Sequence, residues 1–321
     1  MPTDLNEYCH QKINNNSIDI FADGLEDPYN ARALVSCAEL FDARAFLRDR
    51  FGLRQRLDPM LESKLLPSPG LDAVRSSYDR VLTIELAPSA SNLFDYHPPQ
   101  DGEKIAVFVG NERHGVEKAV RRVSDQVLQI PMRGNGVDSL NVVTSAVISG
   151  HHLQFGRSNP RLPRRTIRRP ELVMVNPADP AELGTSLRTA WTLGWDRVFL
   201  QDDFGVWFTR DRAVYAAGRG AARRHRNPIH VVRVDNTRPL FETGIVVTSD
   251  PASTPLREDP ALRSRDCAVI IPSTTAVPLD PELLRIARRY VYVGVCGLAG
   301  ALEHYRLTTG VVLSELMNLQ G

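Results

Sequence analysis

Short apolar runs alternate along the chain with segments of helical period. The predicted strands are VLTIEL (81–86), IAVFVG (105–110) and QVLQIP (126–131), and the predicted helices are ARALVSCAELF (31–41), VEKAVRRVS (116–124) and VVTSAVISGHHL (142–153). Strands that alternate with helices favour an α/β fold, in which crossover helices join the strands of a parallel sheet.

A stretch rich in proline and arginine, RSNPRLPRRTIRRP (157–170), interrupts this alternation. Such composition is typical of a linker. We therefore expect a domain over residues 1–156, a linker over 157–170 and a second domain over 171–321.

The second domain repeats the first at long period. Asp27-Pro28 corresponds to Asp179-Pro180 and Ala38 to Ala190, and one insertion later Phe46-Leu47 corresponds to Phe199-Leu200. Further along, IAVFVG (105–110) corresponds to CAVIIP (267–272), and the helix after Asn141 corresponds to LTTGVVLSELM (307–317). Two distant regions that match in the same order indicate one α/β domain present twice, with strong divergence.

Composition agrees with a two-domain globular protein. The chain has 321 residues, of which 42% are hydrophobic and 24% charged. No apolar run approaches the roughly 20 residues that a membrane span needs. The polar N-terminus lacks the apolar core of a signal peptide, so a cytoplasmic location is expected.

Four cysteines lie far apart in the sequence, each in or beside an apolar segment: Cys9, Cys37, Cys267 and Cys296. We interpret them as reduced and structural, because no Cys-x-x-Cys or Cys/His pairing offers a zinc site. No metal is expected.

Charge is divided unevenly between the halves. Residues 161–321 carry 22 basic residues, all arginine, against 17 acidic ones, and the arginines gather in 161–170 and 218–226. The planar guanidinium suits phosphate, so these groups predict an RNA-binding surface, although a solvated linker and a solvated helix face would have the same composition. The candidate RNA-binding residues are Arg164, Arg165, Arg168, Arg169, Arg219, Arg223, Arg224 and Arg226.

Two motifs follow the predicted strands of the first half. The turn 110–115 reads Gly-Asn-Glu-Arg-His-Gly, and Ile-Pro-Met-Arg-Gly (130–134) is followed by Ser139-Leu140-Asn141-Val142. They resemble the second and third motifs of the SpoU/TrmH branch of SPOUT RNA methyltransferases. DPYNARALVS (27–36) and DPAELGTSLRTA (179–190) resemble its first motif.

The resemblance implies two tandem trefoil-knotted α/β domains with parallel sheets, packed as an intrachain pseudo-dimer. It also implies an enzyme that binds S-adenosylmethionine and methylates a ribose 2′-hydroxyl of RNA, either tRNA or rRNA. The residues that it assigns to the cofactor are Val109, Gly110, Asn111, Glu112, Gly115, Ile130, Pro131, Met132, Gly134, Ser139, Leu140 and Asn141. Glycines let the backbone approach a ligand, and Ile130, Met132 and Leu140 supply apolar walls.

The two copies have lost different parts of the first motif. The first keeps Asn30 but has Ser36 where the family has arginine, whereas the second has Glu182 in place of the asparagine and keeps Arg188. The second copy also has no recognisable cofactor loop. We therefore hypothesise one composite site, with the cofactor held by the first half and Arg188 supplied by the second.

The candidate catalytic residues are Arg188, Asn30, Glu112, Ser139 and Asn141. Arg188 would hold the phosphate of the target nucleotide and polarise its hydroxyl, and Ser139 and Asn141 would also cap the helix that follows them. His114 stands where the family is variable, and no role is expected for it.

Alternatives stay open at this point. A chain with Ser36 in place of the arginine could be a catalytically silent RNA-binding or ribosome-associated protein. A methyltransferase could also act on a small molecule or on another RNA position. A monomer would suffice for the composite site, and a homodimer is possible.

Overall fold

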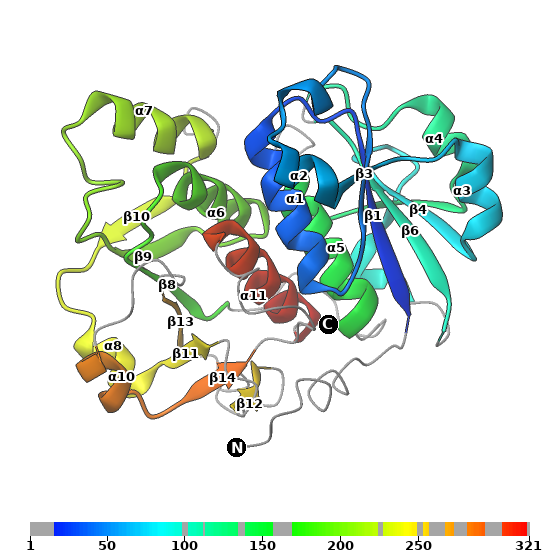
Figure 1. Ribbon diagram of the computed structural model, residues 1–321. Coiled ribbons are helices and arrows are strands. Elements are labelled where there is room, and N and C mark those ends of the chain that lie inside the picture. Colours follow the sequence, from blue (N-terminus) through cyan, green and yellow to red (C-terminus); the bar gives the residue numbers. More distant parts are fainter. Residues whose placement is uncertain are drawn as a thin grey trace.

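The computed structural model describes residues 16–97, 102–111, 113–133, 139–156, 169–223, 227–248, 253–256, 267–272, 281–292 and 304–319. Within these residues the chain forms two sheets of seven strands, in which all paired strands run parallel (Figure 1). The α/β class expected from the alternating pattern is thus confirmed.

The first sheet has the strand order β3-β2-β1-β6-β4-β7-β5. Its strands are β1 (Ser17–Asp23), β2 (Ala45–Arg48), β3 (Leu65–Pro67), β4 (Arg80–Ile84), β5 (Ser91–Asn92), β6 (Lys104–Val109) and β7 (Gln126–Gln129). The helices of this half are α1 (Pro28–Leu40), α2 (Pro59–Lys64), α3 (Leu71–Ser77), α4 (Lys118–Val123) and α5 (Val142–Phe155), with short 3₁₀ turns η2 (Arg54–Arg56) and η3 (Leu93–Asp95).

The second sheet has the order β10-β9-β8-β13-β11-β14-β12. Its strands are β8 (Glu171–Val175), β9 (Arg197–Gln201), β10 (His230–Arg233), β11 (Ile245–Thr248), β12 (Thr254–Pro255), β13 (Ala268–Ile271) and β14 (Tyr290–Tyr292). The helices are α6 (Pro180–Thr192), α7 (Arg212–Ala221), α8 (Arg238–Thr243), α10 (Pro281–Ile286) and α11 (Tyr305–Leu319).

The two halves share one strand order. Replacing each strand of the first sheet by the strand seven places later gives the second sheet, from β3 and β10 at one edge to β5 and β12 at the other. Helices α1 and α6 even begin in the same way, because Asp27 and Asp179 each cap the helix with a side-chain oxygen and a proline follows. The fold therefore repeats, as the sequence repeat predicts.

Each sheet is covered by helices on both faces. On the outer face of the first sheet, Phe21 stacks on Phe46 and Phe108, with ring centroids 4.5 and 4.7 Å apart, and α3 and α4 complete a separate apolar cluster. Helices α8 and α10 cover the outer face of the second sheet in the same manner. The inner faces are covered by α1 and α5 in one half and by α6 and α11 in the other.

The inner layers of the two halves pack against each other. Helix α11 lies beside α5 and α6, and apolar residues of both halves form one continuous core (Figure 1). At the contact a Cβ on Gly310 would lie 2.5 Å from Cγ1 of Val147, so the two helices approach closely. His151 and Glu315 lie across the same contact, with Nε2 and Oε2 3.3 Å apart, and both are buried.

Cys37 and Cys267 are buried and form no disulfide, and burial raises the pKa of the Cys37 thiol. Cys9 and Cys296 lie outside the described residues. No described helix is long and apolar enough to cross a membrane, and the described histidines, cysteines and carboxylates do not gather in groups of three that could hold a metal ion.

Helices α6 and α7 touch through glycine. A Cβ on Gly184 would lie 2.2 Å from the carbonyl oxygen of Gly218 and 2.9 Å from Cβ of Ala221. Gly184, which lies in the stretch 179–190 that resembles the first motif, is therefore needed for packing, because it lets the α7 backbone lie directly on α6.

Gly184→Ala should therefore destabilise the protein, by about 1–3 kcal/mol, because the backbone of α7 cannot move away without disturbing the core. Gly220→Ala, on α7, is the matched control, since a Cβ there meets nothing within 4 Å. It should be neutral or slightly stabilising. Urea denaturation of both variants measures the difference, and equal midpoints would contradict the packing described.

Candidate active site

A cavity of about 380 Å³ opens where three strands of the first sheet end. Ile84 ends β4, Val109 ends β6 and Gln129 ends β7, and the start of α5 closes the cavity. Carboxyl ends of parallel strands are the usual place for a ligand in an α/β protein. The lining residues are Ile84, Glu85, Leu86, Val109, Gly110, Asn111, Arg113, His114, Gly115, Gln129, Ile130, Met132, Ser139, Leu140, Val142 and Ser145.

The turn after β6 depends on its two glycines. A Cβ on Gly110 would lie 2.4 Å from the carbonyl carbon of Gly115, and Gly115 itself has a φ of +63°. Both positions therefore exclude a side chain for steric reasons. The turn brings bare backbone to the cavity wall.

Asn111 holds this turn together. Its Nδ2 donates to the carbonyl oxygen of Gly24 at 2.6 Å and to Oε1 of Glu26 at 2.9 Å, and its Oδ1 accepts from the amides of Arg113 and His114. Because its amide group is fully engaged, the side chain of Asn111 shapes the cavity wall rather than reaching into the cavity.

The cavity has a carboxylate that the sequence motifs did not identify. Glu85 directly follows β4, and its Oε2 accepts from the amide of Val116 at 2.5 Å. The available signal was an acidic residue at the end of an otherwise apolar strand. His114, for which no role was expected, also lines the cavity.

Arg188, from the second half, contacts a residue of the cavity wall. It is buried on α6, and its Nη2 donates to Oγ of Ser139 at 2.8 Å while its Nε donates to the carbonyl oxygen of the same residue. Arg223, just beyond the end of α7, donates from Nη1 to Oγ of Ser139 at 2.6 Å. Two arginines of the second half thus converge on one serine that lines a cavity of the first.

The segment after β7 has a second anchor on the second half. The amide of Arg133 donates to the carbonyl oxygen of Thr192, at the end of α6, at 2.8 Å. The Arg133 guanidinium lies 4.6 Å from the ring centroid of Trp191 and pairs with Asp196. Arg133 and Ser139 therefore each anchor the third motif to the second half.

Asn30 and Asn141 lie beside the cavity rather than in its wall. Asn141 caps α5, with its Oδ1 accepting from the amide of Val143 at 2.9 Å, and its Nδ2 donates to Oδ1 of Asn30 at 3.2 Å. Nη1 of Arg306, on α11, donates to the same Asn30 oxygen at 3.1 Å. Asn30 instead lines a smaller neighbouring cavity of about 200 Å³.

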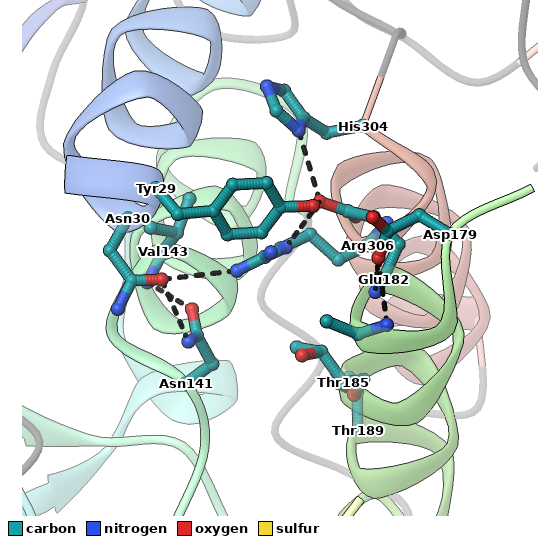
Figure 2. A network of polar contacts seen from close by, with 11 residues as sticks. Tyr29, Asn30, Asn141, Val143, Asp179, Glu182, Thr185, Thr189, His304 and Arg306 are labelled. Carbon is teal, nitrogen blue, oxygen red and sulfur yellow. Dashed lines mark hydrogen bonds and ion pairs between the residues drawn. The ribbon is translucent and has the colours of Figure 1, made fainter. Parts of the chain in front are cut away.

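This pair continues into a polar network between the halves (Figure 2). Glu182 accepts from Tyr29 at 2.6 Å and from the amide and Nε of Arg306 at 2.8 and 2.9 Å, and it lies 3.0 Å from Nδ1 of His304. Burial alone would raise the pKa of Glu182, but these hydrogen bonds and the Arg306 charge lower it to about 2. Burial and the Glu182 carboxylate raise the pKa of Tyr29.

The structure brings together eight of the residues expected to hold a cofactor, namely Val109, Gly110, Asn111, Gly115, Ile130, Met132, Ser139 and Leu140. Pro131 and Asn141 are adjacent but do not line the cavity. Glu112 and Gly134 lie outside the described residues.

The arginines expected to bind RNA have different surroundings. Arg169 lies over Trp195, 4.6 Å from the ring centroid, and burial together with the Arg133 charge lowers the pKa of Arg169 to about 10. Arg219 lies 3.6 Å from the ring centroid of Trp207. Both are engaged inside the second half, and Arg223 points to Ser139. Arg164, Arg165, Arg168, Arg224 and Arg226 lie outside the described residues.

A family comparison matches the segment that forms the cavity. Residues 69–151 match the model of the SpoU rRNA Methylase family, and they run from α3 through β4, β6 and β7 into α5. We therefore call residues 69–151 the SpoU segment.

Curated relatives match the chain over a short length. An uncharacterized tRNA/rRNA methyltransferase of Mycobacterium tuberculosis is 45% identical over 61 residues, which are 17% of this chain and 21% of the relative. A protein of the same description from Mycobacterium bovis gives the same values. The chain thus spans about a fifth of the length of these relatives.

Solved structures of SpoU proteins are also similar to part of the chain. A TrmH/SpoU tRNA modifying enzyme from A. aeolicus is 16% identical, with 47% of this chain and 80% of that chain covered and a TM-score of 0.37. The SpoU methyltransferase AviRb from Streptomyces viridochromogenes, in complex with the cofactor AdoMet, is 18% identical, with 48% and 62% covered and a TM-score of 0.34.

Removing the charge of Glu182, which lies at the centre of the polar network, should weaken the contact between the halves. Glu182→Gln leaves the Arg306 charge buried without its carboxylate, so we expect a loss of about 3–5 kcal/mol in the free energy of unfolding. Glu171→Gln, which removes one side of an exposed pair with Arg197, should cost less than about 1 kcal/mol.

The same carboxylate should make stability depend on pH. Because its pKa falls from 4.5 to about 2 on folding, ionised Glu182 stabilises the fold above about pH 4.5, and this stabilisation is lost as the pH falls towards 2. Urea titrations between pH 7 and pH 3 should show wild type converging on Glu182→Gln. A constant gap between the two proteins over that range would contradict the assignment.

Proposed function

We propose that the chain is an S-adenosylmethionine-dependent RNA methyltransferase that methylates a ribose 2′-hydroxyl of tRNA or rRNA. One composite site would lie between the halves. The observation that carries this proposal is the contact of Arg188 with Ser139, because it joins the second half to a cavity built by the SpoU segment of the first.

The proposal includes the architecture that the family resemblance implies. Residues 1–156 and 171–321 would be two knotted domains, joined by the linker 157–170 and packed as an intrachain pseudo-dimer. The shared strand order supports two copies of one domain, and the packing of α11 on α5 and α6 supports an intrachain pair. One chain would then be sufficient for activity.

The cavity suits a nucleoside cofactor. Its volume lies within the range of about 300–1,000 Å³ that small-molecule sites occupy, and Ile130, Met132 and Leu140 give it apolar walls. The backbone at Gly110 and Gly115 is free of side chains and offers peptide groups for recognition. S-adenosylmethionine would supply a methyl group on a sulfonium, and these residues would hold it.

Arg188 would position the acceptor. Its guanidinium is held by Ser139 at the edge of the cavity, where it would bind a phosphate of the RNA and orient the ribose for in-line attack. A guanidinium keeps its proton, so Arg188 contributes position and electrostatic stabilisation rather than general-base catalysis. RNA as the acceptor is further supported by the tRNA/rRNA methyltransferases to which the chain is similar.

A silent RNA-binding protein is the alternative, and cofactor binding separates the two. Isothermal titration with S-adenosylmethionine should give one site per chain, because the first half has the cavity at its strand ends. Ile130→Trp, which fills the cavity, should abolish the binding heat. Absence of binding to wild type would support the silent alternative, and two sites per chain would contradict a single composite site.

Arg188→Met should lower methyl transfer by about 10²–10³-fold while leaving cofactor affinity unchanged, because it removes a donor that acts on the acceptor. The assay is transfer from labelled S-adenosylmethionine to RNA from cells that lack the protein, followed by digestion to nucleosides. The product should be a 2′-O-methyl nucleoside. Arg197→Met, which removes an exposed arginine from β9, should retain the wild-type rate.

If Arg188→Met kept the wild-type rate, the composite site would be wrong. A base-methylated nucleoside as the product would retain the methyltransferase and overturn the ribose as acceptor.

A further inference from the structure

Arg223 occupies an unusual place for a surface arginine. It lies just beyond α7, and its Nη1 donates to Oγ of Ser139, the hydroxyl that also accepts from Nη2 of Arg188. The sequence favoured a role for it in a basic surface around residues 218–226. The structure instead directs its side chain to the edge of the cavity.

The backbone at Arg223 has an uncommon conformation. Its φ of +50° lies in the left-handed region, where a glycine is the usual residue after a helix. Its amide donates to the carbonyl oxygen of Gly220, and the buried side chain of Asn227 donates to the carbonyl oxygen of Ala222 at 3.1 Å. The arginine thus adopts a conformation that favours glycine, and these two hydrogen bonds hold the backbone of Ala222 and Arg223 in place.

The rigid contact between α6 and α7 sets Arg223 relative to Arg188. Gly184 lets the α7 backbone lie directly on α6, so the two helices are in close contact. Arg188 extends from α6 and Arg223 follows α7, and both end on the same serine oxygen.

Among the described residues, no carboxylate pairs with Arg223, whose Nη1 donates to the uncharged hydroxyl of Ser139. Two guanidinium groups that share one acceptor repel each other. An anion placed between them would relieve that repulsion, and a phosphate accepts the planar donor pattern of both.

We propose that Arg223 and Arg188 together bind one phosphate group of the RNA strand, at Ser139. This inference rests on the proposed function and assigns Arg223 as a positioning residue for the acceptor. Arg188 comes from the first motif of the second copy, whereas Arg223 comes from the end of the next helix. The phosphate would hold the ribose beside the cavity, and Ser139 would keep both guanidinium groups in place until RNA binds.

The test compares Arg223→Met and Arg223→Lys with wild type. Arg285→Met is the control, because it removes one exposed positive charge from the outer helix α10. RNA from cells that lack the protein is the probe, and its affinity is measured by filter binding over a series of salt concentrations. Affinity for S-adenosylmethionine and the urea midpoint are measured on the same samples.

Arg223→Met should make the plot of log affinity against log salt shallower by about 0.7, the contribution of one phosphate contact to a single strand. Methyl transfer should fall at least about tenfold in kcat/KM, mainly through a higher KM for RNA, with cofactor affinity unchanged. Lysine keeps the charge without the planar donors, so Arg223→Lys should recover the slope and part of the rate. Arg285→Met should match wild type.

Several outcomes would overturn the inference. One is a wild-type slope and KM for Arg223→Met, which would leave the proposed function intact as long as Arg188→Met is inactive. Another is Arg223→Lys with a slope shallower than that of wild type by about 0.7, which would mean that the positive charge is not what binds. Because that slope is compared with wild type, it also decides the matter if Arg223→Met proves unstable. If wild type transfers no methyl group, the proposed function fails, and the slopes alone still test whether Arg223 contacts phosphate.

Discussion

The packing of α11 against α5 is the contact on which the rest of the site depends. Each half covers the inner face of its sheet with helices whose other side is apolar, so neither helical layer can face water without a large cost. The packing of these two helical layers against each other places α6 beside the start of α5. Arg188 then reaches Ser139, and Arg133 reaches the end of α6.

The two halves use corresponding positions of this contact in different ways. Asn30 and Asn141 form an uncharged pair next to the cavity, whereas the positions that correspond to them hold Glu182 and His304, which are joined to Arg306 and Tyr29 (Figure 2). A buried carboxylate with this many donors is costly to disturb. One side of the contact between the halves thus borders an open cavity, and the other carries an ionic network that joins the halves.

The alternation of apolar runs and helical segments was enough to predict the strands that carry the site. The repeat and the two motifs of the first half were visible in the sequence itself. The resemblance to the SpoU/TrmH motifs also singled out Arg188 and Ser139, because each lies in a matching motif. The orientation of Arg223 was not predictable, since it depends on a contact between residues far apart in the chain. For Glu85 the sequence offered one weak signal, an acidic residue at the end of an apolar strand, and its contact with the amide of Val116 appears only in the structure. Arg223 belongs to a run of basic residues, and only its backbone conformation after α7 shows that it leaves the surface.

The central claim is that one chain assembles one site from both of its halves, and mixing two defective chains tests it most directly. Arg188→Met lacks the arginine but keeps the cavity, while Ile130→Trp loses the cavity but keeps the arginine. If the site forms within a chain, an equimolar mixture should transfer methyl groups no faster than the two variants do separately. Recovery of activity towards a quarter of the wild-type rate would show that Arg188 acts on the cavity of another chain, and would contradict the account.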